Sequence, residues 1–101
     1  MIKVYISGKI TGLSADQVAE KFKRAEKQVA SFGFEPVSPL NNGVAPEAPW
    51  REHMKRDIAM LLDCDGIYLL RDWGDSSGAR IEFNIAKECG LDIMEQPEYA
   101  I

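Results

Sequence analysis

The sequence is poor in the residues that build metal centres and disulfide frameworks. Its 101 residues include two cysteines, Cys64 and Cys89, and a single histidine, His53. The cysteines form no CxxC pair, so a structural zinc site is close to excluded, and one histidine rules out a catalytic centre that needs two. We therefore expect two free, buried thiols, as is usual in a reducing cytosol, and a cytoplasmic protein.

Long apolar runs and an excess of positive charge are lacking as well. No apolar stretch approaches the roughly 18–20 residues of a membrane span. The first residues, 1–6, follow a strand pattern and lack the layout of a signal peptide. The 12 Lys and Arg are outnumbered by 16 Asp and Glu, which gives a net charge of −4. Because affinity for a phosphate backbone comes from clustered Lys and Arg, we expect neither a nucleic-acid polymer nor a membrane as partner.

The chain does contain enough apolar material to build a core. Apolar residues make up 46% of the sequence and charged residues 28%. This composition is typical of a folded domain and excludes a disordered segment. Since compact domains mostly hold about 50–250 residues, we expect residues 1–101 to form a single domain.

Short apolar runs alternate with amphipathic stretches along the whole chain. We expect strands at 2–7, 34–38, 66–70 and 91–94, and helices at 15–32, 50–63 and 78–89. This order predicts an α/β fold with a doubly wound parallel sheet of four to five strands. Ligands of such sheets bind beyond the carboxyl ends of the strands, so the loops of interest are 8–14, 39–49 and 71–78.

Glu82 stands on the apolar side of the helix expected at 78–89. At about 100° per residue it falls within the arc that contains Ile81 and Ile85. A carboxylate among core positions costs several kcal/mol unless it is paired or faces a cavity, while the positive end of the helix dipole favours an anion. The alternative is a carboxylate that caps or neutralises the helix N-terminus, but a capping box fails because Ala79 stands where Ser or Thr is needed. We expect Glu82 to be ionised and to face a cleft.

Asp57 is a second carboxylate on an apolar helix face, that of the helix expected at 50–63. The apolar face of this helix begins with Trp50, which we interpret as a core residue, and Asp57 falls within the same face. The alternative to a functional role is a buried ion pair with Arg56, Arg80 or Lys9. Two misplaced acids on neighbouring helices of a doubly wound sheet favour a carboxylate-based active site.

Two loops and one basic run complete the candidates. The segment 8–12 (GKITG) matches neither a dinucleotide nor a P-loop motif, and its amides either line a small anion or sugar or form an ordinary turn. Ser76, Ser77 and Gly78 suit a phosphate at a helix N-terminus, with a plain serine N-cap as the alternative. Trp50 and Trp73 both lie beside the expected cleft, where a planar base could stack on either; the core is favoured for Trp50, and Trp73 is harder to explain as a core residue. The basic residues of the first helix are expected to form a solvated face: Lys21, Lys23, Arg24 and Lys27.

Three motifs together resemble the nucleoside 2-deoxyribosyltransferase superfamily. They are residues 4–8 (VYISG), Asp57 followed by the pair 64–65 (CD), and residues 77–82 (SGARIE). The resemblance covers nearly the whole chain and is strongest to a compact phage and bacterial branch that begins with a similar YISGKITG run. The superfamily also includes 2′-deoxynucleoside 5′-phosphate N-hydrolases. The resemblance implies a flavodoxin-like or Rossmann-like fold.

The resemblance also implies roles for individual residues. Glu82, four residues after a glycine, corresponds to the nucleophile, Tyr5 to a tyrosine that orients it, and Asp57 to an acid of the base or sugar site. The transferases carry an aspartate six residues before the glutamate, where this chain has Ser76, and the N-hydrolases use serine in this region to hold a 5′-phosphate. The residues expected to bind substrate are Ser7, Gly8, Lys9, Ile10, Trp73, Ser76, Ser77 and Gly78.

The implied activity is cleavage or transfer of the N-glycosidic bond of a nucleoside or nucleotide, through a glycosyl ester on Glu82. No metal or organic cofactor is expected. The expected partners are a small-molecule nucleoside or nucleotide and further copies of the chain, in a homo-oligomer of two or more. Three alternatives stay open: a non-catalytic nucleotide-binding module of the same fold, an NAD⁺ glycohydrolase, and a purely structural interaction domain.

Overall fold

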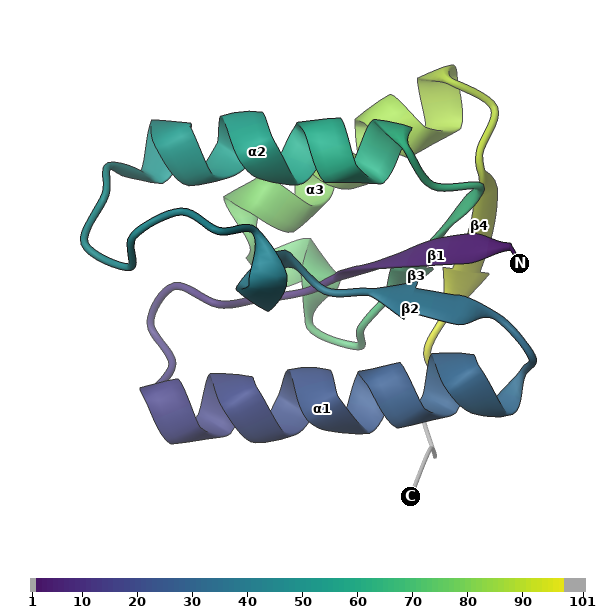
Figure 1. Cartoon of the computed structure of the whole chain (residues 1–101), viewed down its shortest axis with the longest axis horizontal. Coiled ribbons are helices and arrows are strands. Elements are labelled where there is room, and N and C mark those ends of the chain that lie inside the picture. Colours follow the sequence, from purple (N-terminus) through teal and green to yellow (C-terminus); the bar gives the residue numbers. More distant parts are fainter. Residues whose placement is uncertain (1, 98–101) are drawn as a thin grey trace.

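A four-stranded parallel sheet forms the centre of the molecule, with helices on both faces (Figure 1). The computed structural model describes residues 2–97. The elements follow one another as β1 (Lys3–Ser7), α1 (Ala15–Ser31), β2 (Glu35–Val37), α2 (Trp50–Leu62), β3 (Gly66–Leu69), α3 (Ser77–Glu88) and β4 (Asp92–Glu95). Short 3-10 turns, η1 (Pro39–Asn41) and η2 (Trp73–Asp75), follow β2 and β3. The α/β fold with a parallel sheet is confirmed.

The strand order creates the crevice in which ligands of such folds bind. The sheet runs β2-β1-β3-β4, so the chain leaves β1 toward one edge and leaves β3 toward the other. Figure 1 shows α1 on one face of the sheet and α2 with α3 on the other. Because the loops after β1 and β3 diverge, a crevice opens beyond the carboxyl ends of these two central strands.

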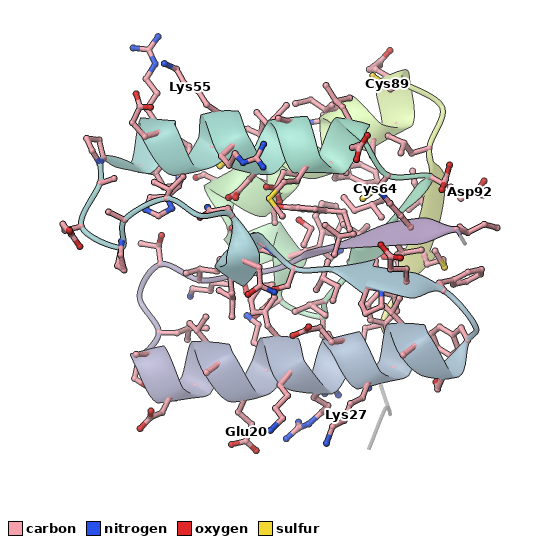
Figure 2. All side chains as sticks on the ribbon, viewed as in Figure 1. Glu20, Lys27, Lys55, Cys64, Cys89 and Asp92 are labelled. Carbon is pink, nitrogen blue, oxygen red and sulfur yellow. The ribbon has the colours of Figure 1, made fainter. Side chains whose placement is uncertain are left out.

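Local sequence signals determine where helix α1 begins and ends and which of its faces is buried. Ser14 and Gln17 form a capping box at its start, and Gly33, with a φ of 88°, follows its end. The buried residues recur at helical spacing: Val18, Phe22, Ala25 and Val29. Glu20 and Lys27 project away from the sheet (Figure 2). The amphipathic pattern therefore positions one face of α1 against the sheet.

Alternation along β1 sends its side chains into two separate cores. Val4 and Ile6 pack against α1, whereas Tyr5 packs in the core beneath α2 and α3. Successive residues of a strand face opposite sides of a sheet, so Ser7 shares the side of Tyr5. The first strand thereby presents two hydroxyl groups toward α3.

The buried face of α3 differs from the expected arc. On α3 the buried residues are Ala79, Glu82 and Ala86, while Ile81 is 39% exposed. The two small alanines let the helix lie close to the sheet, which centres the buried face on Glu82. The expectation of two buried thiols was wrong for Cys89, which is exposed at the C-terminal end of α3, whereas Cys64 is buried.

Neither a membrane-spanning helix nor a metal site is found among the described residues. None of the helices within 2–97 has the length and apolar character needed to cross a bilayer. The same residues bring together no group of three or more His, Cys, Asp or Glu side chains able to hold a metal ion.

Gly8, directly after β1, is needed because the chain passes close to Leu70. A Cβ at position 8 would lie 2.7 Å from Cδ1 and 2.9 Å from Cβ of Leu70, which is 1% exposed and cannot move aside. Overpacking of this kind typically costs about 1–3 kcal/mol, so Gly8→Ala is expected to lower the free energy of unfolding by that amount. Urea denaturation measures it, with Gly74→Ala as control because a Cβ there meets nothing within 4 Å. Equal midpoints for the two variants would contradict the steric argument.

Candidate active site

A cavity of about 870 Å³ opens beyond the carboxyl end of β1. Its walls come from the loop after β1, the loop before α2, and the first turns of α2 and α3. The residues that line it include Tyr5, Gly8, Lys9, Ile10, Asn42, His53, Asp57, Ser76, Ser77, Gly78 and Glu82. Ligand pockets of proteins typically enclose about 300–1,000 Å³, so the cavity can take a molecule of nucleotide size.

Glu82 projects from α3 into this cavity and is held by two hydroxyl groups of β1. The phenol of Tyr5 donates to Oε2 at 2.8 Å, and the hydroxyl of Ser7 donates to Oε1 at 2.7 Å. Glu82 is 5% exposed, and both donors are completely buried. Each carboxylate oxygen is therefore fixed by one hydrogen bond from the sheet, which orients the carboxylate for contact with a ligand.

Burial shifts the protonation of Glu82. Desolvation raises the pKa of its carboxyl from the usual 4.5 to about 7, although the hydrogen bonds from Ser7 and Tyr5 lower it and the negative charge of Asp57 raises it. Burial, and the neighbouring Glu82, raise the pKa of the Tyr5 phenol well above 10.0, so the phenol stays a donor. Glu82 therefore ionises less readily than a carboxyl in water, although both hydrogen bonds favour its ionised form.

Asp57 enters the same cavity from α2 and is 7% exposed. Its partner is the side-chain amide of Asn42, whose Nδ2 donates to Oδ1 of Asp57 at 2.8 Å. The ion pair considered from sequence was wrong, because an amide rather than a cation meets this carboxylate. Burial raises the pKa of Asp57, while the hydrogen bond from Asn42 and the proximity of His53 lower it.

The loop after β1 is tied down by a residue of the first helix. The backbone amide of Lys9 donates to Oδ1 of Asp72 at 3.1 Å, and Nζ of Lys21 lies 2.6 Å from Oδ2 of Asp72 and also donates to the carbonyl of Lys9. The side chain of Lys21 is only 22% exposed, so its assignment to a solvated face was wrong. This clamp fixes the backbone at Lys9, a residue that lines the cavity.

The N-terminus of α3 forms another wall. The side chain of Ser76 caps the helix by accepting from the amide of Ala79 at 3.1 Å. The amides of Ser77 and Gly78 make no hydrogen bond to any residue of the part of the chain that the structure describes, and both residues line the cavity. The serine N-cap is therefore present, and it leaves two amides without a partner at the positive end of the helix, a position that favours anions in general.

Two aromatic residues lie elsewhere than expected. Trp73 does not line the cavity: its ring packs on Phe83, with centroids 4.7 Å apart, beside a smaller hollow of about 480 Å³. Trp50, expected in the core, is 52% exposed and lines the main cavity. Trp50 is the first residue of α2, so it has no preceding helical turn to cover its ring.

Most of the remaining predicted residues line the cavity, together with two residues that the sequence analysis did not select. Ser7 contacts Glu82 rather than the cavity surface, so it supports the carboxylate instead of touching a ligand. Asn42 and His53 line the cavity beside Asp57 but were not singled out from sequence. The pair Asn42-Gly43 is a turn signal that predicts a loop there, yet nothing in it predicts the partners of the Asn42 side chain.

Tyr5→Phe is expected to move the pH profile of the site. Removing the donor takes away an interaction that lowers the pKa of Glu82, so this pKa rises further, by about one unit for a hydrogen bond to a charged group. Tyr68→Phe is the matched control, because that buried phenol donates instead to Gln28. Titration of the Glu82 carboxyl followed by NMR tests this, and coincident titration curves for both variants and the parent would contradict it.

Comparison with known proteins agrees with this architecture. A family model described as a domain of unknown function, DUF4406, matches residues 2–95. No curated protein matches the chain. Among solved structures, a 2-deoxyribosyltransferase from Leishmania mexicana superposes with a TM-score of 0.72 at 17% identity, over 94% of this chain and 63% of its own. The 2-deoxyribosyltransferase from Bacillus psychrosaccharolyticus gives a TM-score of 0.70 at 18% identity, over 98% of this chain and 75% of its own. The chain thus has the fold of these enzymes.

Proposed function

The chain belongs to the DUF4406 family, whose function is unknown, and we propose that it cleaves or transfers the N-glycosidic bond of a (deoxy)nucleoside 5′-monophosphate. One observation carries the proposal. Glu82 is a buried carboxylate at the wall of a ligand-sized cavity, held by hydroxyl donors on both oxygens. A carboxylate so placed suits the positive charge that develops at C1′ when a base leaves. The shared fold of the two 2-deoxyribosyltransferases supports the same reaction class.

The proposed reaction proceeds in two balanced steps. An ionised oxygen of Glu82 forms a bond to C1′ as the C1′–N bond breaks, and the electron pair of that bond leaves with the base. The base takes a proton, for which Asp57 is the proposed donor, since burial favours its protonated form. Water or a second base then bonds to C1′, its proton passes to the Asp57 carboxylate left by the first step, and Glu82 is released as a carboxylate, with retention of configuration at C1′.

The 5′-phosphate is assigned to the start of α3. Ser77, Gly78 and Lys9 line that part of the cavity, and the amides of Ser77 and Gly78 have no partner within residues 2–97, whereas the Ser77 hydroxyl already accepts from the Arg80 guanidinium at 3.2 Å. Free amides and a helix dipole favour an anion at this position, and Lys9 adds a positive charge. We therefore expect nucleoside monophosphates to be preferred over nucleosides.

A homo-oligomer is part of the proposal. Trp50 and Ile81 leave large apolar side chains 52% and 39% exposed on α2 and α3, the pair of helices that contact each other above the sheet. A second copy of the chain that covers them would also narrow the cavity beside Trp50. Light scattering at several concentrations tests this, and a monomer throughout would overturn this part of the proposal.

The direct test is a mass-spectrometric screen for free base. The purified protein is incubated with nucleosides, nucleoside monophosphates and NAD⁺. Release of base from deoxynucleoside monophosphates supports the proposal. Nicotinamide released from NAD⁺ alone would instead make the protein a glycohydrolase of that cofactor. Thermal stabilisation by a nucleotide without any product, equal in the parent and in Glu82→Gln, would make it a binding module.

A further inference from the structure

Asn42 is held at the edge of the cavity by four hydrogen bonds of its side chain and carbonyl. Its Nδ2 lies 2.8 Å from Oδ1 of Asp57 and 3.2 Å from Nδ1 of His53. Its Oδ1 accepts from the amide of Val44 at 2.8 Å, and its backbone carbonyl accepts from Nε of Arg56 at 3.3 Å. Asn42 is 8% exposed, so this amide is a buried link between the loop after β2 and helix α2.

These partners determine which way the Asn42 amide points. The amide of Val44 is a donor, so the atom facing it must be the carbonyl oxygen of Asn42. The opposite orientation would put that oxygen against the carboxylate of Asp57 and an NH₂ group against the N–H of Val44. Nδ2 therefore faces both Asp57 and His53, and its two hydrogens serve one partner each.

The orientation of Asn42 in turn determines which tautomer a neutral His53 ring adopts. Nδ2 of Asn42 is only a donor, so Nδ1 of His53 must accept, and a neutral ring then carries its proton on Nε2. His53 lines the cavity, and its Nε2 makes no hydrogen bond to any residue within 2–97. The ring thus retains one unused N–H donor next to the ligand space.

We propose that His53 binds the nucleobase by donating from Nε2 to a ring nitrogen or carbonyl oxygen, and that Asn42 is the positioning residue that holds His53 in this role. The inference rests on the proposed function for the nature of the ligand. Asp57, held by the same amide, keeps its second oxygen for the same base. A base without an acceptor atom at this edge is therefore bound more weakly.

The tautomer can be measured without any ligand. His53 is the only histidine of the chain, so its ring signals in ¹⁵N–¹H NMR spectra are unambiguous. We expect the neutral ring in the Nε2–H form, and in Asn42→Asp the Nδ1–H form, because a carboxylate at position 42 accepts where the amide donated. An Nδ1–H ring in the parent protein would overturn the inference.

Binding is measured in the Glu82→Gln background, where turnover is blocked, with deoxynucleoside monophosphates as probes. A glutamine amide can replace Nε2 of histidine, whereas an asparagine amide reaches only the position of Nδ1. We expect His53→Gln to keep the affinity within about threefold and His53→Asn to lose about tenfold, as for one hydrogen bond. A nucleotide analogue whose base lacks the acceptor, such as a deaza base, is expected to bind about tenfold more weakly than the unmodified nucleotide when His53 is present. With His53→Asn, the analogue and the unmodified nucleotide are expected to bind equally.

The outcomes separate this inference from the proposed function. Equal affinity for His53→Gln, His53→Asn and the parent overturns the role of His53, whether or not the parent releases base. Binding that depends on His53 without base release by the parent overturns the catalytic proposal and leaves the role of His53 in binding. A failure of every nucleotide to bind overturns both.

Discussion

Glu82→Gln is expected to lower kcat/KM for base release by at least about 1,000-fold, because the amide cannot form the ester with C1′. The substitution keeps the shape of the side chain and lets Tyr5 and Ser7 retain hydrogen bonds, since both hydroxyls can donate or accept. The loss is therefore expected in kcat, with nucleotide binding largely preserved.

Glu20→Gln is the matched control for this experiment. Glu20 lies on the outer side of α1, far from the cavity lining, and its side chain is 74% exposed (Figure 2). The same change of charge at that position is expected to leave the rate within twofold. Base release by Glu82→Gln at a tenth of the parent rate or more would contradict a nucleophilic role.

The stability of the folded protein is expected to fall between pH 4.5 and pH 7 because of Glu82. Below pH 4.5 the carboxyl is protonated in both the folded and the unfolded chain. As the pH rises, the unfolded chain loses this proton first, because burial holds the folded-state pKa at about 7. The difference corresponds to about 3 kcal/mol of the free energy of unfolding, lost as the pH reaches the folded pKa and constant above it.

Comparison of the parent with Glu82→Gln isolates this contribution from all other titrating groups. Thermal unfolding is followed for both proteins between pH 4 and pH 8. For a domain of this size, about 3 kcal/mol corresponds to about 12–24 °C, so the Tm of the variant is expected to rise by that amount relative to the Tm of the parent across that range. A Tm difference that does not change with pH would show that Glu82 titrates as it does in water.

The fold was predictable because its signals are local and repeated. The apolar run at 66–70 reads as a buried strand, and the spacing of Val18, Phe22 and Val29 reads as a helix packed on one face. Helical spacing alone does not say where the centre of a buried face lies. Ile81 was therefore placed inside and proved exposed, because Ala79 and Ala86 set how α3 lies on the sheet.

The site was predictable where a residue breaks its local pattern. Glu82 and Asp57 are acids on apolar helix faces, and both line the cavity. Asn42 and His53 break no pattern, since polar residues are ordinary in a loop and at the boundary of the apolar face of a helix. Their roles come from contacts between segments distant in sequence, and the packing of Trp73 on Phe83 is of the same kind.

The covalent bond between Glu82 and C1′ is the central step of the proposed mechanism. Intact-protein mass spectrometry after rapid acid quenching of a reaction with a deoxynucleoside monophosphate should show a population heavier by one deoxyribosyl phosphate. Peptide analysis should place the added mass on Glu82, and Glu82→Gln should carry none. Release of base with no adduct at any quench time, and at an undiminished rate in Glu82→Gln, would contradict the mechanism.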